Sequence, residues 1–184
     1  MPNRAAVREE LPRQLARPQD GTGFAVLTLN CDRFRQLNDS LGQAGGDQLL
    51  MHMADRLRGA LRPPTTASEP ATRSGQLAAR VGGDEFVVVL DGLRARLDAE
   101  RVARRLLEAL AHPYLIGGHE IVCSGSLGVA WGPDAVALKE HSGYDPDSLL
   151  RDAGIAMVEA KRAGGKPHAV FEASMRERGG RRAH

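Results

Sequence analysis

The chain has 184 residues, of which 42% are apolar and 26% charged, and its formal net charge is +2. This length supports one domain with a substantial core, and the small charge argues neither for nor against a polyanionic partner. Only 4% of the residues are aromatic, and no basic stripe with interleaved aromatic residues occurs. We therefore expect no nucleic-acid-binding surface.

The two cysteines, Cys31 and Cys123, lie in separate apolar runs. Such isolated thiols predict neither a disulfide framework nor a zinc site, and they are typical of a reduced protein. The longest apolar runs, FAVLTL and FVVVL, are far shorter than the ~20 residues that span a bilayer. The charged start of the chain, MPNRAAVREELPRQ, has no apolar signal region. We expect a cytoplasmic domain without membrane contact.

The first half of the chain predicts three helices and one strand. Residues 4–16 are charged and contain Pro12, which favours a short surface helix. Residues 23–31 read as a buried strand. A short helix follows and is closed by Gly42, and a second helix over 45–61 carries apolar residues at helical spacing. Residues 63–76 are rich in Pro, Thr and Ser and predict an exposed, flexible insert.

The second half predicts two hairpins, two helices and a last strand. Each hairpin turns at a Gly-Gly pair, and each helix has an apolar face. The expected elements are strands 77–81 and 85–90, helix 95–111, strands 113–117 and 119–132, helix 147–165 and strand 168–171. Hairpins mixed with helical crossovers indicate an α+β fold of the ferredoxin-like kind, with a mixed, largely antiparallel sheet flanked by helices.

The sequence Gly-Gly-Asp-Glu at 82–85 forms the turn of the first hairpin. A Gly-Gly pair suits a hairpin because both residues tolerate positive φ, so a solvated turn with two surface acids is one interpretation. Strongly apolar strands flank the turn, which indicates a central hairpin. A second polar segment follows the first strand, so a functional site is the other interpretation.

That second segment contains Asn30, Asp32, Asn38 and Asp47. Asn30 and Asp32 are two residues apart at a strand end, so their side chains leave the same face. Asp47 lies in the first turn of a helix, where an acid complements the helix dipole. A carboxylate and an amide are also the pair of groups that reads guanine, with the carboxylate accepting from the ring N–H and the exocyclic amine.

Together these segments, FAVLTLNCDRFRQLNDSLGQAGGD and RVGGDEF, resemble the GGDEF domain of diguanylate cyclases. The resemblance extends over nearly the whole chain, from MPNR to the late strand CSGSLGVA and the final helix LLRDAGIAMVEAKRAGG. It implies a single nucleotidyl-cyclase-like domain over 1–184, with a leading segment 1–20 and an exit linker 173–184. The exit sequence AVFEASMRER is most similar to the junction into an EAL phosphodiesterase domain, so we expect an EAL or sensory neighbour.

The resemblance implies a reaction in which two GTP condense into cyclic di-GMP and release two pyrophosphates. Each domain binds one GTP, so a homodimer is needed for catalysis. Charge builds on oxygen atoms during this transfer, and Mg²⁺ or Mn²⁺ must absorb it. Mg²⁺ prefers carboxylate oxygens and strict geometry.

The family's site residues are carried over by position. Asp84 matches the metal ligand of the turn, and Glu85 matches the acid that assists at the reacting phosphate or hydroxyl. Asn30 and the backbone carbonyl of Cys31 match the other metal ligands. Asn38 and Asp47 match the guanine readers, and Phe34 and Arg35 match the turn that contacts the phosphates. Gly82 and Gly83 match the glycines that let the backbone approach the nucleotide. Lys161 matches a lysine that binds the triphosphate, and Lys166 is a candidate for the second triphosphate cation.

Three departures from the family bear on activity. Asn30 stands where the metal-binding Asp is expected, so the ligand keeps an oxygen but loses its negative charge, although Asp32 on the same face is a possible substitute. Gly165 replaces a second triphosphate cation, for which Lys166 is the neighbouring candidate. The product-inhibition pair falls on Arg73 and Gln76, where the expected Asp is missing, so we expect no tight inhibitory site there.

Three functions remain open from the sequence. The first is a diguanylate cyclase, supported by the intact turn and guanine readers, with activity weak or lost because of Asn30. The second is a catalytically silent GTP-binding domain that regulates an EAL phosphodiesterase. The third is a dimerisation module that binds no nucleotide.

Overall fold

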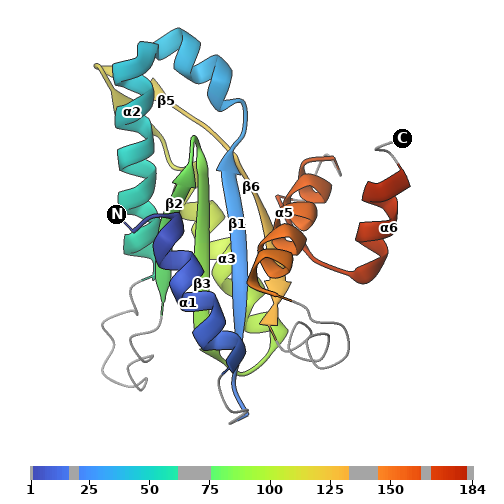
Figure 1. Ribbon diagram of the computed structural model, residues 1–184. Helices are drawn as coiled ribbons and strands as arrows, with labels where there is room; N and C mark the ends of the chain where they lie inside the picture. The colour runs from blue at the N-terminus through green and yellow to red at the C-terminus, as the bar shows by residue number, and fades with distance from the viewer. Residues whose placement is uncertain (1, 17–20, 62–75, 133–144, 163–166, 182–184) are drawn as a thin grey trace.

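The computed structural model describes residues 2–16, 21–61, 76–132, 145–162 and 167–181 (Figure 1). The helices are α1 (Arg4–Ala16), α2 (Phe34–Leu61), α3 (Arg96–Ala111), α5 (Pro146–Arg162) and α6 (Ala173–Arg181). The strands are β1 (Gly23–Cys31), β2 (Leu77–Gly82), β3 (Glu85–Leu93), β4 (Tyr114–Ile116), β5 (His119–Ile121), β6 (Gly125–Trp131) and β7 (His168–Val170). None of the helices in these ranges is both long and apolar enough to cross a membrane.

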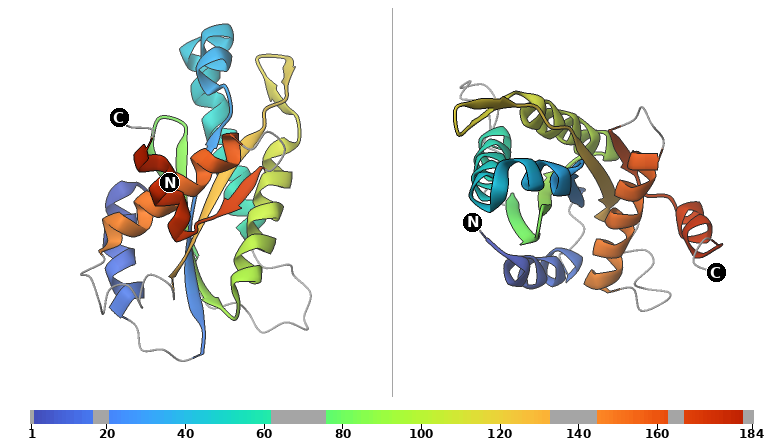
Figure 2. Two further views of the ribbon diagram at one scale, coloured as in Figure 1. Left: turned by 90° about the vertical axis from the view of Figure 1, so that its right-hand side faces the viewer. Right: turned by 90° about the horizontal axis from the view of Figure 1, so that it is seen from above.

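Five strands form the central sheet in the order β2-β3-β1-β6-β7. The pairs β2–β3, β3–β1 and β1–β6 are antiparallel, whereas β6 and β7 are parallel. Helices α2 and α3 cover one face of the sheet, and α1 and α5 lie on the other (Figures 1 and 2). This confirms the predicted α+β class with a mixed, largely antiparallel sheet.

Successive side chains of β1 point to opposite faces of the sheet and belong to two separate hydrophobic clusters. Ala25, Leu27 and Leu29 are buried in the cluster that contains α2 and α3. Phe24 and Val26 are buried in the smaller cluster that contains α1 and α5. Because both faces of β1 are covered, its sequence is a continuous apolar run instead of an alternating one.

Helix α1 begins where predicted, but it is more than a surface helix. Asn3 caps its first turn, since the Asn3 Oδ1 accepts a 3.1 Å hydrogen bond from the backbone of Ala5. Val7, Leu11 and Leu15 are buried against the sheet. The expectation of a surface helix was therefore wrong. Val7, Leu11 and Leu15 are spaced four residues apart, so they form one apolar stripe that packs on the sheet, although most other residues of the helix are polar or charged.

The two helices predicted after β1 are both present as the two parts of α2. The chain bends at Gly42, whose φ of 76° and ψ of 169° are non-helical. A positive φ costs glycine little, so the bend falls on this residue. The bend turns the second part of α2 back along the sheet (Figure 1).

The predicted strand 119–132 is in fact two strands in two sheets. Within the described ranges, β5 pairs with β4 alone, and β6 joins the central sheet. Arg56 of α2 fixes the start of this small hairpin, since it donates to the carbonyls of Ala109, His112 and Pro113 and lies 3.6 Å from the centroid of the Tyr114 ring. These contacts join residues more than 50 positions apart, so sequence periodicity does not show where the strand divides.

Two segments at the end of the chain complete the fold. The last strand, β7, forms as predicted. The segment that we assigned to an exit linker contains α6, which packs on α5 (Figure 2). Residues 63–75 of the predicted insert 63–76, and the predicted helix end at Gly164 and Gly165, lie outside the described residues.

Candidate active site

The site begins where β1 ends. Asn30 is the cross-strand partner of Glu85 on β3 and of Ser126 on β6. The Oδ1 atom of Asn30 is buried and has no hydrogen-bond partner among the residues that the structure describes. A buried amide oxygen without a partner is costly in a folded protein, and such a group often marks a ligand position.

Asp32, two residues on, is fully engaged within the protein. Its Oδ2 accepts a 2.7 Å hydrogen bond from the hydroxyl of Ser124, and its Oδ1 accepts one of 2.7 Å from Ser126. The backbone N–H of Asp32 also donates to the carbonyl of Ser124 at 2.9 Å. Asp32 therefore ties the end of β1 to β6, and this argues against its replacing the missing metal Asp at position 30.

The acidic hairpin turns one residue later than the Gly-Gly pair suggests. Gly82 closes β2 opposite Glu85, so the two turn residues are Gly83 and Asp84. Gly83 has a φ of 48°, and the Arg80 side chain fixes the turn by donating a 2.8 Å hydrogen bond to the Gly83 carbonyl. The turn carries the Asp84 side chain, and the first strand position after it carries Glu85.

The two predicted metal-binding segments lie close together. The pairing of Asn30 with Glu85 places the hairpin turn near the end of β1. The hydrogen bond with Cys123 and burial raise the pKa of the Cys31 thiol, and the nearby carboxylates of Asp84 and Asp32 raise it further. The Cys31 thiol is therefore neutral, and only its backbone carbonyl is suited to a cation.

Asn38 and Asp47, the predicted guanine readers, lie on the two parts of α2 at its bend. A Cβ atom built on Gly46 would lie 1.9 Å from the Oδ1 of Asn38, so the Asn38 side chain rests directly on the Gly46 backbone. The bend thus brings Asn38 beside the turn that contains Asp47. Asp47 is exposed, and Asn38 is half-buried.

We expect Gly46→Ala to displace the Asn38 amide, because the added methyl group would overlap it. If Asn38 reads guanine, GTP affinity should fall about tenfold, which corresponds to the loss of roughly one hydrogen bond, or ~1.4 kcal/mol. Calorimetric titration with GTP measures this. Gly59→Ala, in the same helix with open space around it, is the control and should bind as the wild type does. Equal affinity for both variants would contradict the role of Asn38.

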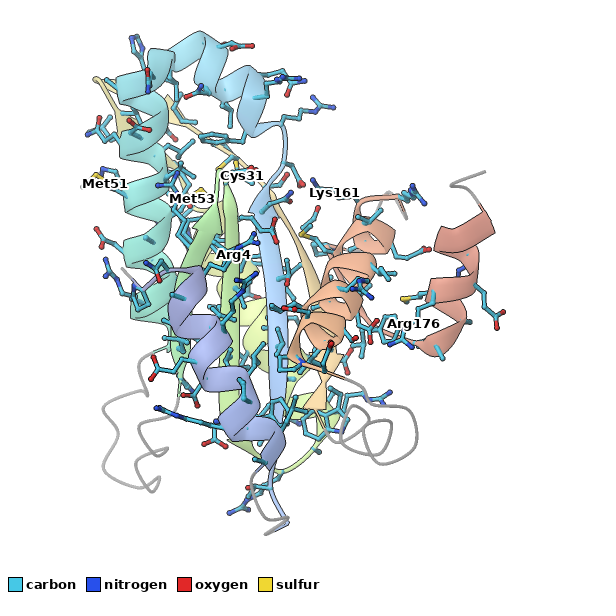
Figure 3. The ribbon with its side chains drawn as sticks, viewed as in Figure 1. Arg4, Cys31, Met51, Met53, Lys161 and Arg176 are labelled. Carbon is cyan, nitrogen blue, oxygen red and sulfur yellow. The ribbon has the colours of Figure 1, made fainter. Side chains whose placement is uncertain are left out.

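A broad groove of about 1110 Å³ runs from the β1–α2 turn to the end of α5. Asp32, Arg33, Ser126 and Lys161 line it, and Lys161 lies at the end of α5 facing this region (Figure 3). Arg33 has a φ of 56°, which is unusual for a residue other than glycine and indicates a tightly specified turn. Sequence reasoning singled out Lys161 but missed Arg33 as a groove residue.

The structure describes some, but not all, of the remaining predicted site residues. Phe34 packs on the core at the start of α2, and Arg35 is exposed beside it. Gln76 precedes β2 and is half-buried. Arg73 and Lys166 lie outside the described residues, so the inhibitory-site and second-cation assignments stay predictions.

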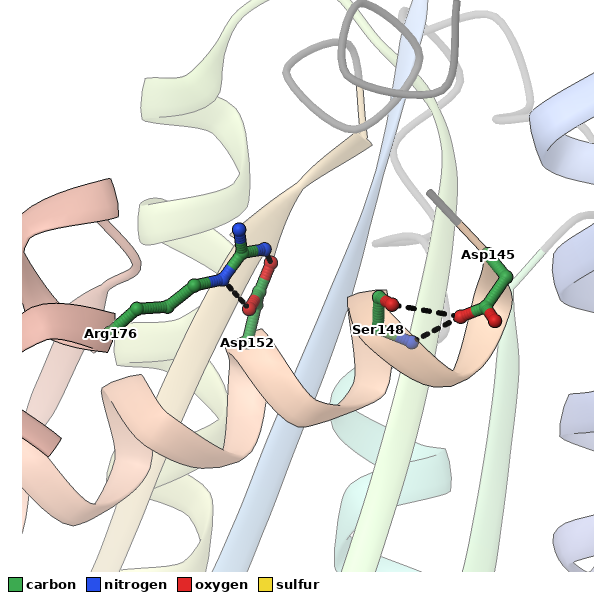
Figure 4. Close-up of polar contacts among 4 residues, drawn as sticks. All are labelled: Asp145, Ser148, Asp152 and Arg176. Carbon is green, nitrogen blue, oxygen red and sulfur yellow. Dashed lines mark hydrogen bonds and ion pairs between the residues drawn. The ribbon is translucent and has the colours of Figure 1, made fainter. Parts of the chain in front are cut away.

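Helix α5, which carries Lys161, is held in place by polar contacts at its start and its middle. The Asp145 carboxylate accepts 2.8 Å hydrogen bonds from the backbone N–H and hydroxyl of Ser148, and these bonds lower the pKa of Asp145 (Figure 4). The buried Asp152 carboxylate accepts two hydrogen bonds, of 2.9 and 2.5 Å, from the Arg176 guanidinium on α6 (Figure 4). Such bidentate pairs fix orientation.

The end of β1 and the hairpin turn fit a divalent cation. The unpartnered Asn30 Oδ1, the Cys31 carbonyl and the Asp84 carboxylate are all oxygen donors, which is the ligand type that Mg²⁺ and Mn²⁺ take. Within the described ranges, no three His, Cys, Asp or Glu side chains cluster as a metal site. A site with one carboxylate, one amide and one carbonyl is compatible with that finding, but it carries little negative charge.

Solved structures define the class to which this fold and site belong. The GGDEF domain of TpbB (also YfiN) from Pseudomonas aeruginosa superposes with a TM-score of 0.78 at 34% sequence identity and covers 94% of this chain and 97% of that one. An EAL/GGDEF domain protein from M. capsulatus gives 0.68 at 36% identity, with coverage of 93% and 99%. The class is the nucleotidyl-cyclase-like α+β domain.

Sequence comparison makes the assignment specific. The family model described as "Diguanylate cyclase, GGDEF domain" matches residues 1–167. The bifunctional diguanylate cyclase/cyclic di-GMP phosphodiesterase MucR of P. aeruginosa is 33% identical over 95% of this chain, and the diguanylate cyclase TpbB is 37% identical over 88%. The chain spans only 23% and 34% of these relatives' lengths. It belongs to the GGDEF family.

Proposed function

We propose that this domain binds GTP with a divalent cation and has weak diguanylate cyclase activity because Asn30 occupies the metal-ligand position. The observation that carries the proposal is the buried, unpartnered Oδ1 of Asn30 beside Glu85 and the Asp84 turn. The family's relatives named as diguanylate cyclases support the reaction class.

Each part of the site has a role in this proposal. Asn38 and Asp47 bind the guanine edge, and their placement on either side of the α2 bend supports that role. Lys161 and the β1–α2 turn bind the triphosphate along the groove that they line. Asn30, the Cys31 carbonyl and Asp84 hold the cation, which supplies charge stabilisation at the phosphate oxygens when it is bound.

Glu85 is the proposed acid–base residue. Glu85 is half-buried and pairs with Asn30, which supports a role in accepting the proton of an attacking 3′-hydroxyl. The variant Glu85→Gln keeps the shape of the side chain but removes the proton acceptor.

We expect the domain to bind GTP at least tenfold more tightly than ATP in the presence of Mg²⁺. A site whose polar groups form hydrogen bonds with guanine leaves these groups unpaired when adenine is bound. Calorimetry with both nucleotides is the test, and Asp47→Ala should reduce the preference. Equal binding of the two nucleotides, or no binding of either, would contradict the proposed function.

A second candidate function is regulation of an EAL phosphodiesterase domain by GTP. The specific observation in its favour is that α6, at the exit of the domain, is joined to the middle of α5 by the Arg176–Asp152 pair. Helix α5 carries Lys161 near its end, so the Arg176–Asp152 pair links the helix that would bind the nucleotide to α6. An EAL-containing version of the chain in which GTP changes phosphodiesterase activity, and Arg176→Ala abolishes that change, would support this candidate.

A further inference from the structure

The small β4–β5 hairpin packs on α2 near the bend that carries the proposed guanine readers (Figure 1). A two-stranded hairpin is at best marginally stable by itself in water, so other elements must hold it. Tyr114 and Ile116 of β4 are 1% and 2% exposed, whereas Leu115 between them is 69% exposed. One face of the hairpin is therefore packed against the domain, and the other face is in solvent.

Arg56 of α2 anchors the start of this hairpin. Its Nη1 atom donates a 3.3 Å hydrogen bond to the carbonyl of Ala109, and its guanidinium also donates to the carbonyls of His112 and Pro113. Ala109 lies in the last turn of α3, where the carbonyls lack partners within the helix. The guanidinium also lies 3.6 Å from the centroid of the Tyr114 ring, as a cation–π contact. These contacts fix the position of β4 relative to α2.

Ile116 is the point where the hairpin contacts the bend of α2. A Cβ atom built on Gly45 would lie 3.7 Å from the Cγ2 of Ile116 and 2.8 Å from the Cβ of Leu41. Leu41 belongs to the part of α2 before the bend, so both parts of the helix and the hairpin meet at the Gly45 backbone. The next residue, Gly46, is the one on which the Asn38 side chain rests.

The angle of the bend decides how far apart the guanine readers are. Glycine populates many backbone conformations, so Gly42 permits the bend but does not by itself fix its angle. Asn38 lies before the bend and Asp47 after it, and both must reach the edge of one base. Groups that bind a ligand together must be held to within about 0.5 Å, so contacts around the bend have to supply the missing restraint.

We propose that Ile116, held in place by Arg56, is a positioning residue for guanine recognition. Its contact with Gly45 sets the angle of the α2 bend and thereby the separation of Asn38 and Asp47. This inference rests on the proposed function. Ile116 itself is buried and acts only through the helix that it supports.

The test compares three variants of the hairpin. Ile116→Ala removes the Cγ2 atom near Gly45, Ile116→Val keeps a methyl group there, and Leu115→Ala truncates the exposed neighbour as the matched control. Calorimetry with Mg²⁺ measures the affinities for GTP and for ITP, whose base lacks the exocyclic amine that Asp47 is proposed to bind. Partial unfolding lowers both affinities equally, so their ratio reports recognition and is independent of stability.

The wild type, Ile116→Val and Leu115→Ala should bind GTP about tenfold more tightly than ITP, which corresponds to roughly one hydrogen bond. Ile116→Ala should reduce this ratio to about threefold or less. Arg56→Lys keeps the charge but loses the planar fork that reaches several carbonyls, so it should reduce the ratio as well. Arg58→Lys, at an exposed arginine paired with Asp55 on the same helix, should leave the ratio unchanged.

The outcomes separate this inference from the proposed function. If Ile116→Ala keeps the tenfold ratio, or if Leu115→Ala lowers it equally, the positioning role is wrong and the proposed function stands. If Ile116→Ala does not fold, Arg56→Lys against Arg58→Lys decides by the same criterion. A wild type that binds no GTP, or that binds GTP and ITP equally, contradicts guanine recognition itself, and this appears in the first titration.

Discussion

Asn30→Asp is expected to raise cyclase turnover at least about tenfold over the wild type. The substitution places a carboxylate where a neutral amide now offers its unpartnered oxygen. A charged ligand binds Mg²⁺ more strongly and stabilises charge that develops in the transition state. A tenfold rate increase requires only ~1.4 kcal/mol, which is modest for one added charge at a cation site. Chromatography of cyclic di-GMP formed from GTP measures it.

The melting temperature of the variant tests the same argument without depending on turnover. Without a cation, Asp at position 30 would face Glu85 across the strands, and like charges at such a pair are destabilising. Asn30→Asp should therefore have a lower melting temperature than the wild type in chelator and a larger increase on adding Mg²⁺.

The controls for this variant follow from the same ligand set. Asn30→Ala removes the oxygen altogether and should be less active than the wild type. The double variant Asn30→Asp/Asp84→Asn restores the original charge and should lose the gain. A wild type that already turns over rapidly, with no effect of Asn30→Asp, would show that the lost charge does not limit activity.

Gly128→Ala is expected to destabilise the domain by about 3 kcal/mol. A Cβ atom at this position on β6 would lie 2.0 Å from the carbonyl oxygen of Ala153 and 2.3 Å from the backbone nitrogen of Met157, both on α5. These are backbone atoms, so the whole helix must move away from the sheet, and overpacking of this kind costs 1–3 kcal/mol or more. Urea denaturation followed by circular dichroism measures the free energy of unfolding.

The matched control is Gly59→Ala on α2, where a Cβ would meet nothing within 4 Å. Alanine loses less conformational entropy than glycine in a helix, so this variant should be more stable than the wild type by about 0.5–1 kcal/mol. Gly128→Ala should also weaken GTP binding, because α5 carries Lys161. Equal stability of Gly128→Ala and the wild type would contradict the close packing of α5 on β6.

Local patterns were sufficient for most of the secondary structure. The apolar run of β1, the helical spacing around Leu50 and Leu57 and the glycines at 82–83 and 117–118 identified the elements with small errors at their ends. The errors have physical causes. The hairpin turn is shifted to Gly83 and Asp84 because Gly82 pairs with Glu85, and β5 leaves the main sheet because Arg56 holds the small hairpin on α2.

The residue pattern of the sequence was enough to indicate the GGDEF family through its resemblance, which the family model confirms, and to predict that Asn30 stands where a charged ligand is expected. Whether Asp32 is available to replace that ligand depends on contacts that the folded chain makes. Its two oxygens accept hydrogen bonds from serines more than 90 positions away, and no local pattern encodes such a contact. Likewise, Ile116 of β4 lies beside Gly45 of α2 only because the β4–β5 hairpin packs on that helix.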